Sequence, residues 1–239
     1  MKRALSLYLP MWSIDRVRRR WRIGREKTGN EGQGPGAKGQ GKGSRTQDAG
    51  LRTQDLLPSI LLITTSADRQ LIVQCCEQSR AAGVRPGMTL AHARALLPEK
   101  GQGPRAKGQG NANPQSTIRH PQSLPFAPHA DLAALHRLAQ WCTRFCPTVA
   151  PDPELADIVH ASNFDLFASR FPLHTGLLMD ITGCDRLYRG EVNLARALAD
   201  AMHHLGFTCR LAIAPTFGAA WALARFGEHH PDRVVLLAH

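Results

Sequence analysis

Residues 177–183 read LLMDITG, and residues 211–225 read LAIAPTFGAAWALAR. Each stretch opens with a short apolar run, which is typical of a buried strand. An amphipathic stretch lies between them and ends at Gly206, a residue type that often closes a helix. The two stretches and their surroundings therefore predict a strand at 177–181, a helix at 191–205, a strand at 207–214 and a helix at 217–226.

Similar patterns toward the N-terminus predict further elements of ordinary length. Thr89 and Asp131 stand where helix N-caps are expected. The expected elements are strands at Ala4–Leu9, Leu61–Thr65 and Gln70–Cys75, and helices at Met11–Arg22, Glu77–Ala82, Thr89–Leu97 and Asp131–Phe145. Their order belongs to the α+β class. It suits a ferredoxin-like sheet that carries an inserted small helical subdomain.

Two Gly-rich blocks divide the chain. Residues 32–41 read GQGPGAKGQG, and residues 101–110 read GQGPRAKGQG. Neither block can bury apolar surface, and the many glycines make ordering costly, so both are expected to be disordered. We therefore expect flexible insertions at 23–58 and 99–127, which separate the ordered segments 1–22, 59–98 and 128–239.

Composition favours a folded protein with a polyanionic partner. The 239 residues are 43% hydrophobic and carry a formal net charge of +11, although some of that charge falls in the Gly-rich blocks. Such an excess suits nucleic acid or an anionic membrane surface. No apolar run reaches the roughly 18–20 residues of a membrane span, so no membrane association is expected. The six cysteines lack paired metal-ligand spacing and are expected to be reduced core residues of a cytoplasmic protein.

Three segments carry a resemblance to a known family. Residues 4–20 read ALSLYLPMWSIDRVRRR and residues 79–98 read SRAAGVRPGMTLAHARALLP, and the stretches that open this section complete the set. Together they resemble the Y-family translesion DNA polymerases (the UmuC domain), and most closely the inactive ImuB branch of that family. The resemblance implies a polymerase palm at 1–22 and 128–239 and a fingers-like subdomain at 59–98. It also implies that the little-finger and C-terminal domains of relatives are absent.

The resemblance also indicates where catalytic residues would stand. Two-metal nucleotide transfer needs three carboxylates, because Mg²⁺ takes oxygen ligands in tight octahedral geometry. The matching positions hold Leu7, Thr175 and Gly176. Asp180 lies four residues beyond Gly176, roughly 13 Å along a strand, which is too far to replace a ligand. We therefore expect no catalysis, no metal and no other cofactor.

Other positions that contact the triphosphate in active relatives are altered as well. The fingers position for a Tyr holds Glu77, although Arg80 is kept. An Asn-Lys pair and a later Lys are matched by Thr216, Phe217 and Trp221. The cations that would hold phosphates are therefore mostly lost, which fits a fold kept for binding.

Clustered arginines are the candidate DNA contacts. They are Arg16, Arg18, Arg19, Arg20 and Arg22 on the first helix, and Arg80 and Arg85 in the fingers-like segment. Guanidinium groups bind phosphates, and Trp21 among them offers a ring for base stacking. A solvated, charge-rich helix end explains the first cluster equally well.

These observations favour a non-catalytic accessory protein in DNA repair, a DNA-binding adaptor of error-prone translesion synthesis and SOS mutagenesis. The resemblance implies three protein partners: an error-prone replicative-type polymerase, a RecA-like accessory protein and the sliding clamp. DNA binding is expected to be weak and dominated by phosphates, and the location cytoplasmic and nucleoid-associated. Two alternatives stay open: an active polymerase with atypical metal ligands, and a generic basic nucleic-acid-binding domain.

Overall fold

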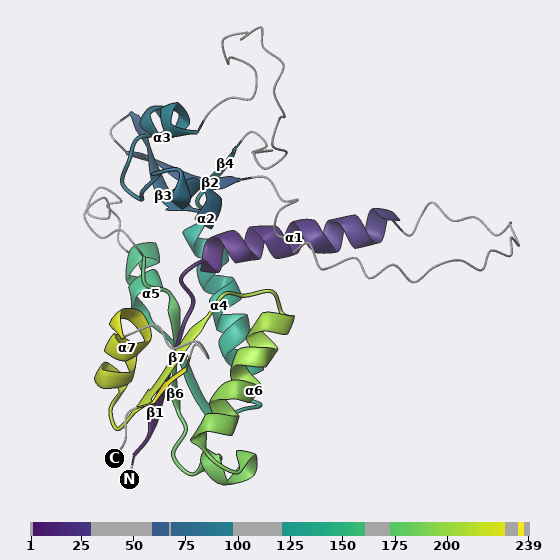
Figure 1. Ribbon diagram of the computed structural model, residues 1–239, viewed down its shortest axis with the longest axis vertical. Helices are drawn as coiled ribbons and strands as arrows, with labels where there is room; N and C mark the ends of the chain where they lie inside the picture. The colour runs from purple at the N-terminus through teal and green to yellow at the C-terminus, as the bar shows by residue number, and fades with distance from the viewer. Residues whose placement is uncertain are drawn as a thin grey trace, which may run out of the picture.

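The computed structural model describes residues 2–29, 59–66, 68–97, 121–160, 173–227 and 234–236. These residues form a large α/β part built on a five-stranded sheet and a smaller part built on a three-stranded sheet (Figure 1). The larger part contains β1 (Ala4–Tyr8), α1 (Trp12–Gly29), α4 (Pro128–Cys142), β5 (Thr148–Pro151), α5 (Pro153–His160), β6 (Gly176–Asp180), η3 (Cys184–Tyr188), α6 (Glu191–His204), β7 (Arg210–Ala214), α7 (Phe217–Phe226) and β8 (Val234–Leu236). The smaller part contains β2 (Ile60–Ser66), β3 (Arg69–Cys75), α2 (Glu77–Ala81), α3 (Leu90–Leu96) and β4 (Gln122–Pro125). The mixture of helices and sheets confirms the predicted α+β class.

The first strand lies in the middle of the large sheet. The strand order is β5-β6-β1-β7-β8, and β1 runs antiparallel to both β6 and β7. In the register, Leu7 faces Leu177 on one side and Leu211 on the other. The N-terminal strand is therefore held by two segments that lie far away in the sequence.

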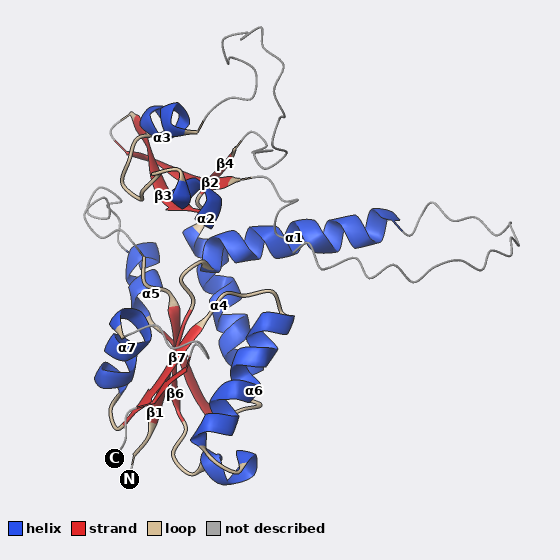
Figure 2. Cartoon of the chain, viewed as in Figure 1, coloured by secondary structure: helices blue, strands red, loops and turns tan. Residues whose placement is uncertain are grey.

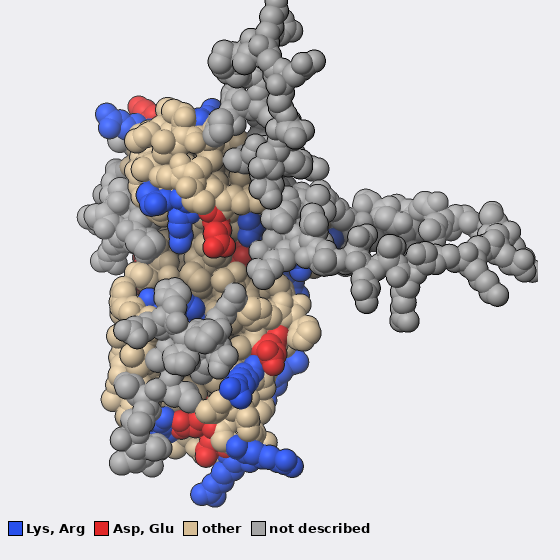
Figure 3. Space-filling model, in the orientation of Figure 1, with Lys and Arg blue, Asp and Glu red and all other residues tan. Residues whose placement is uncertain are grey.

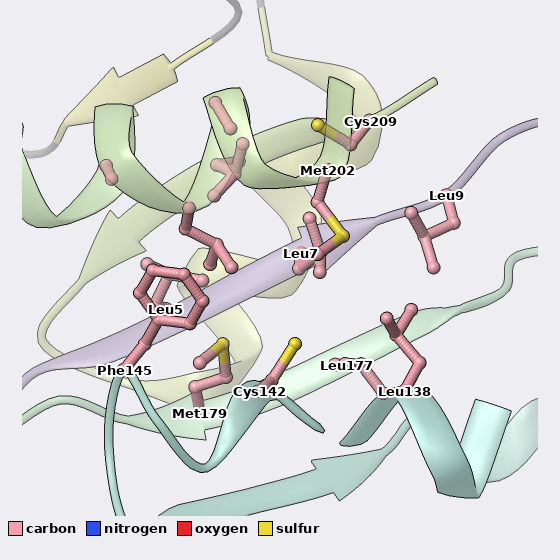
Figure 4. Packing of buried hydrophobic residues seen from close by; sticks show 14 of the residues in the cluster. Leu5, Leu7, Leu9, Leu138, Cys142, Phe145, Leu177, Met179, Met202 and Cys209 are labelled. Carbon is pink, nitrogen blue, oxygen red and sulfur yellow. The ribbon is translucent and has the colours of Figure 1, made fainter. Parts of the chain in front are cut away.

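Side chains alternate between the two faces of this sheet. Leu5, Leu7 and Leu9 point toward α4 and α6 and join the main hydrophobic core (Figure 4). On the opposite face, Ala4 and Tyr8 pack against the small residues of α7. Figure 2 shows α6 and α7 on opposite sides of the strands. Fully burying a leucine contributes about 1.5–3 kcal/mol, so the leucines of β1 fix its register.

Helix α1 joins the two parts of the molecule. Ile14, Val17 and Trp21 recur at helical spacing and pack with Ile60 and Leu62 of the smaller part. The smaller sheet has the order β3-β2-β4, so the fingers-like part has a sheet at its centre as well as helices. Strands β2 and β3 lie where strands were predicted, at Leu61–Thr65 and Gln70–Cys75.

One predicted cap, Thr89, is confirmed by a hydrogen bond, and the structure adds a cap, Thr216, that was not predicted. The Oγ1 of Thr89 accepts a hydrogen bond from the His92 amide at 3.3 Å, at the start of α3. Thr216 does the same for the Ala219 amide at 3.2 Å, at the start of α7. Gly206 has a φ of 81°, a conformation that glycine adopts easily, and it closes α6 as predicted.

Several predicted boundaries are wrong. Helix α1 continues to Gly29, seven residues past the predicted end at Arg22. The expected insertion 99–127 contains β4, which pairs in parallel with β2. Asp131 lies inside α4 and is not its N-cap, because the helix already begins at Pro128. Both Gly-rich blocks lie outside the described residues.

No helix in the described part of the chain combines the length and the apolar character that a membrane span requires.

Candidate functional site

The position predicted to have lost the first metal ligand lies in the hydrophobic core. Leu7 is completely buried among apolar residues of β1, β6, α4 and α6 (Figure 4). An ionised carboxylate there would lose its hydration without gaining a partner, which is prohibitively costly.

The position of the third predicted ligand, Gly176, lies on the opposite face of the sheet from Leu7. Gly176 pairs with Tyr8, so it faces α7, whereas Leu7 faces the main core. Thr175 precedes β6, and its carbonyl oxygen accepts the Leu9 amide at 2.8 Å. Leu7 and Gly176 therefore point to opposite faces of the sheet, and the assignment of Leu7, Thr175 and Gly176 to the positions of lost ligands stays a prediction from the resemblance.

Gly176 also has no room for a side chain. A Cβ built on it would approach the carbonyl oxygen of Leu7 to under 3.0 Å, a separation that real Cβ atoms essentially never show. The same Cβ would lie 3.3 Å from Nη2 of Arg225. A glutamate at this position would require β1 and Arg225 to move.

The guanidinium of Arg225 fills the space beside Gly176. Its Nη2 lies 2.6 Å from Oδ2 of Asp152, and the two side chains are only 1% and 4% exposed. Its Nη1 donates to Oγ of Ser6 at 3.2 Å and to the carbonyl of Trp221 at 3.3 Å. The guanidinium carbon also lies 4.8 Å from the ring centre of Tyr8 and 4.4 Å from that of Trp221. An arginine in an aromatic cage thus occupies this face of the large sheet.

Burial dominates the electrostatics of this Arg225–Asp152 pair and its neighbours. Burial lowers the pKa of Arg225, while the charge of Asp152 raises it. Burial raises the pKa of Tyr8, and the positive charges of Arg225 and other arginines oppose that shift. The single negative charge of Asp152 is already shared between Arg225 and the indole Nε1 of Trp221, which donates at 2.6 Å.

The residues at this face do not fit a metal ion. A fixed guanidinium would repel a divalent cation, and the carboxylate in contact with it, Asp152, is bonded to that guanidinium. Within the described ranges, no group of three His, Cys, Asp or Glu residues could hold a metal. Asp180 pairs with Ala4, at the opposite end of β1 from Tyr8, and caps the next turn through the Thr182 amide at 3.0 Å.

The residues that replace the triphosphate contacts of active relatives lie at two different helices, α2 and α7. Glu77 and Arg80 are exposed on α2, whereas Thr216 caps α7. Phe217 is 45% exposed, and Trp221 bonds to Asp152 as described.

The five candidate arginines of α1 point in three directions. Arg16, Arg19 and Arg20 line a cleft against α4 and the end of α6. Arg18 is half-buried, and its guanidinium influences Asp15 and Cys76. Arg22 is exposed and lies beside Gly206, where a Cβ would meet its Nη1 at 3.1 Å. The structure therefore does not gather the five arginines into one surface.

Two further candidate residues occupy the smaller part. Arg80 and Arg85 are exposed near the end of α2. The Nη1 of Arg85 donates to the carbonyls of Arg80 at 2.6 Å and Val84 at 2.9 Å, so its guanidinium is fixed in place. Trp21, the proposed stacking residue, packs instead against the hydrophobic cluster between α1 and β2. Lys and Arg side chains are scattered over the visible face and form no continuous band there (Figure 3).

One buried acid was missed by the sequence analysis. Asp15 is 3% exposed, and its Oδ2 accepts the Thr208 amide at 2.8 Å, which ties α1 to the turn before β7. Burial raises its pKa to about 6, against the opposing effect of the Thr208 hydrogen bond. The signal was available, because Asp15 lies one position from the hydrophobic Ile14 in a helix otherwise rich in arginine.

Part of the sequence of this chain is similar to that of known proteins. The chain is 42% identical over 128 residues to Protein ImuB of two strains of Caulobacter vibrioides, NA1000 / CB15N and ATCC 19089 / CIP 103742 / CB 15. The match covers 54% of this chain but only 23% of each relative. The chain thus matches less than a quarter of the length of these relatives.

The fold is that of known DNA polymerases. The insertion ternary complex of Dbh DNA polymerase matches with a TM-score of 0.54 at 10% identity, over 99% of this chain and 48% of that one. DinB from Sulfolobus solfataricus matches with a TM-score of 0.52 at 10% identity and the same coverage. At this identity the likeness concerns the fold alone.

A model of the impB/mucB/samB family matches residues 48–225, which is most of the chain. The chain therefore belongs to the impB/mucB/samB family.

Proposed function

We propose that this chain is a non-catalytic, polymerase-like accessory protein of error-prone translesion DNA synthesis. The observation that carries the proposal is the Arg225–Asp152 pair beside Gly176, where a buried guanidinium stands and no side chain can be added. A polymerase centre requires clustered carboxylates and bound metal ions, and this arrangement supports neither. The similarity to Protein ImuB supports a role in the response to DNA damage.

DNA binding in this proposal is weak and runs through phosphates. Arg20, Arg22 and Arg80 are exposed and have long, flexible side chains suited to phosphate contacts. Arg85 adds a guanidinium that is already oriented by two carbonyls. Arg16 is a poor candidate, because it is paired with Asp131. The protein partners implied by the resemblance are a replicative-type polymerase, a RecA-like protein and the sliding clamp. In this proposal the partner polymerase performs the synthesis, and the assembly acts at the nucleoid in the cytoplasm.

Primer extension tests the absence of catalysis. The purified chain is expected to add no nucleotide to a primed template with either Mg²⁺ or Mn²⁺. Extension that is lost on Leu7→Ala or Thr175→Ala, in variants that circular dichroism shows to be folded, would establish an active polymerase with atypical ligands and overturn the proposal. Extension that survives both changes would indicate a contaminating enzyme, since it would not depend on the palm.

Salt dependence tests the mode of DNA binding. The logarithm of the association constant should fall linearly with the logarithm of salt concentration, and each lost phosphate contact should reduce the slope by about 0.9 on duplex DNA. Arg22→Ala and Arg80→Ala are expected to reduce the slope in this way. Arg186→Ala is the matched control, because Arg186 is equally exposed but lies on η3, beyond the other end of α6. Equal effects of all three changes would indicate a generic basic surface, which is the rival function.

A further inference from the structure

The cleft between α1, α4 and the end of α6 concentrates positive charge around an apolar floor. It has a volume of about 500 Å³. Its rim carries Arg16, Arg19 and Arg20 from α1 and Arg137 from α4, and its floor includes Leu138 and Leu205. None of the described residues that line it is acidic. The only carboxylate bonded to this rim in the described part is that of Asp131, which pairs with Arg16.

The guanidinium groups of the rim repel one another. Burial lowers the pKa of Arg16, and the charges of Arg137 and Arg20 lower it further. Arg20 and Arg137 are exposed, so they can turn toward a ligand. An anionic ligand at the rim would relieve this repulsion. Of the four rim arginines, Arg16 is paired with Asp131 and the other three add positive charge, so a ligand with more than one negative charge is favoured.

The aromatic rings of the cleft are not available for stacking a base. Trp12 and Phe207 pack on each other with ring centres 5.1 Å apart, and both are buried. The guanidinium of Arg19 lies 5.5 Å from the ring centre of Phe207. Arg144 covers Trp141 at 4.1 Å. Single-stranded nucleic acid, which binds largely through stacking on open rings, is therefore disfavoured.

An apolar side chain flanked by carboxylates fits both features of the cleft. Ile23 is 44% exposed at the rim, and with Leu138 and Leu205 it offers apolar contact. Protein interfaces combine buried apolar and aromatic anchors with arginines in this manner. We propose that the cleft is a docking site for an acidic peptide segment of a partner protein, which inserts an apolar side chain between the guanidinium groups. Arg20 serves both proposals, as a phosphate contact and as part of this rim, whereas Arg137 belongs to the cleft proposal alone.

Tryptophan NMR locates the binding. The chain has four tryptophans, of which Trp12 and Trp141 line the cleft and Trp221 lies on α7 beside Asp152. The probe is the peptide acetyl-Glu-Asp-Glu-Leu-Phe-Glu-Asp-Glu-amide, titrated into the full chain labelled with ¹⁵N. The indole signals of Trp12 and Trp141 are expected to shift in a saturable manner, while that of Trp221 stays in place. No saturable shift at Trp12 and Trp141 would overturn the proposal.

Two matched probes separate the rival ligands. A peptide with Ser-Ser in place of Leu-Phe keeps the charge, and it should bind at least several-fold more weakly if the apolar floor is used. An oligo-dT of equal net charge tests nucleic acid. Equal binding of the Ser-Ser peptide, or stronger saturable shifts of the same two signals with oligo-dT, would overturn the proposal.

Variants at the rim test the charge contribution. Arg20→Ala and Arg137→Ala should each weaken binding of the acidic probe by about two- to fivefold, the range of exposed ion pairs. Both residues are exposed, so neither change should disturb folding, and an unchanged set of indole signals in the free protein verifies that. Arg186→Ala should leave the affinity for the probe unchanged. Equal losses in all three variants would show a non-specific charge effect and overturn the proposal.

Discussion

Nη2 of Arg225 lies 2.6 Å from Oδ2 of Asp152, and the two residues, 73 positions apart, are both almost fully buried. Arg225 belongs to α7, and Asp152 stands directly between β5 and α5. The pair therefore ties the C-terminal helix to the opposite edge of the large sheet. It also fills the face of the palm where Gly176 leaves space.

Removing one partner of this pair should destabilise the protein strongly. Arg225→Met leaves Asp152 buried without its guanidinium, and Asp152→Asn leaves Arg225 buried without a counter-charge. Each change is expected to cost about 3–5 kcal/mol in the free energy of unfolding, measured by urea denaturation. The double variant should cost less than the sum, because no uncompensated charge remains. Additive losses would show that the two side chains do not act as a pair.

A side chain at Gly176 should be poorly tolerated. Gly176→Ala brings a Cβ too close to the Leu7 carbonyl, so the two central strands must separate. A loss of about 1–3 kcal/mol in the free energy of unfolding is expected, as for overpacked cores. Gly218→Ala is the matched control, because nothing lies within 4 Å of its Cβ position in α7. It should be neutral or stabilise by up to about 1 kcal/mol, and a similar loss for both variants would contradict the steric argument.

Restoring carboxylates should not restore metal binding. In the triple variant Leu7→Asp, Thr175→Asp, Gly176→Glu, the first side chain points into the core and the third lacks room. We expect no binding of Mn²⁺ by electron paramagnetic resonance, and a less stable protein. The variant must be compared with the unmodified chain at a temperature where both are folded. Stoichiometric Mn²⁺ binding would show that the palm keeps a usable metal site.

The sequence predicts the strands β1, β6 and β7 of the large sheet, but not its edge strands β5 and β8 or its buried contacts. The apolar runs around Leu7 and Met179 are long enough to identify β1 and β6 directly. Strands β4 and β5 contain only four residues each and include a proline, so they carry little periodic signal. The start of α4 was predictable from Pro128, since proline is favoured in the first turn of a helix.

The functional face depends on contacts that no local pattern reveals. Arg225 and Asp152 carry no motif that links them, and their pairing follows only from the way α7 packs on β1. The arginines of α1 were predictable as a cluster. Which of them line the cleft, which one lies near Cys76 and which one lies beside Gly206 depends on the elements that surround the helix.

The buried Asp15 should make stability depend on pH. Its pKa is about 6 in the folded protein against 3.8 as a model value, so the folded state binds more protons than the unfolded state between these values. The free energy of unfolding should therefore fall as pH rises from about 4 to 6, by roughly 3 kcal/mol for this group at 1.36 kcal/mol per pKa unit. Asp15→Asn keeps an oxygen that can accept the Thr208 amide but cannot titrate. The difference in unfolding free energy between variant and unmodified protein should change with pH in this window, and a constant difference would disprove the linkage.

The cysteines should be unreactive in the folded protein. All six are free and buried, which blocks access to a thiol reagent. Burial raises the pKa of Cys142 to about 12 and that of Cys146 to about 11. Burial also acts to raise the pKa of Cys76, but hydrogen bonds from Ser79 and Ile60 outweigh it and lower the pKa overall. Alkylation with iodoacetamide along a urea series, read by peptide mass spectrometry, should therefore begin only at urea concentrations where the protein opens. Rapid labelling of any of the six cysteines without urea would contradict the packing around them.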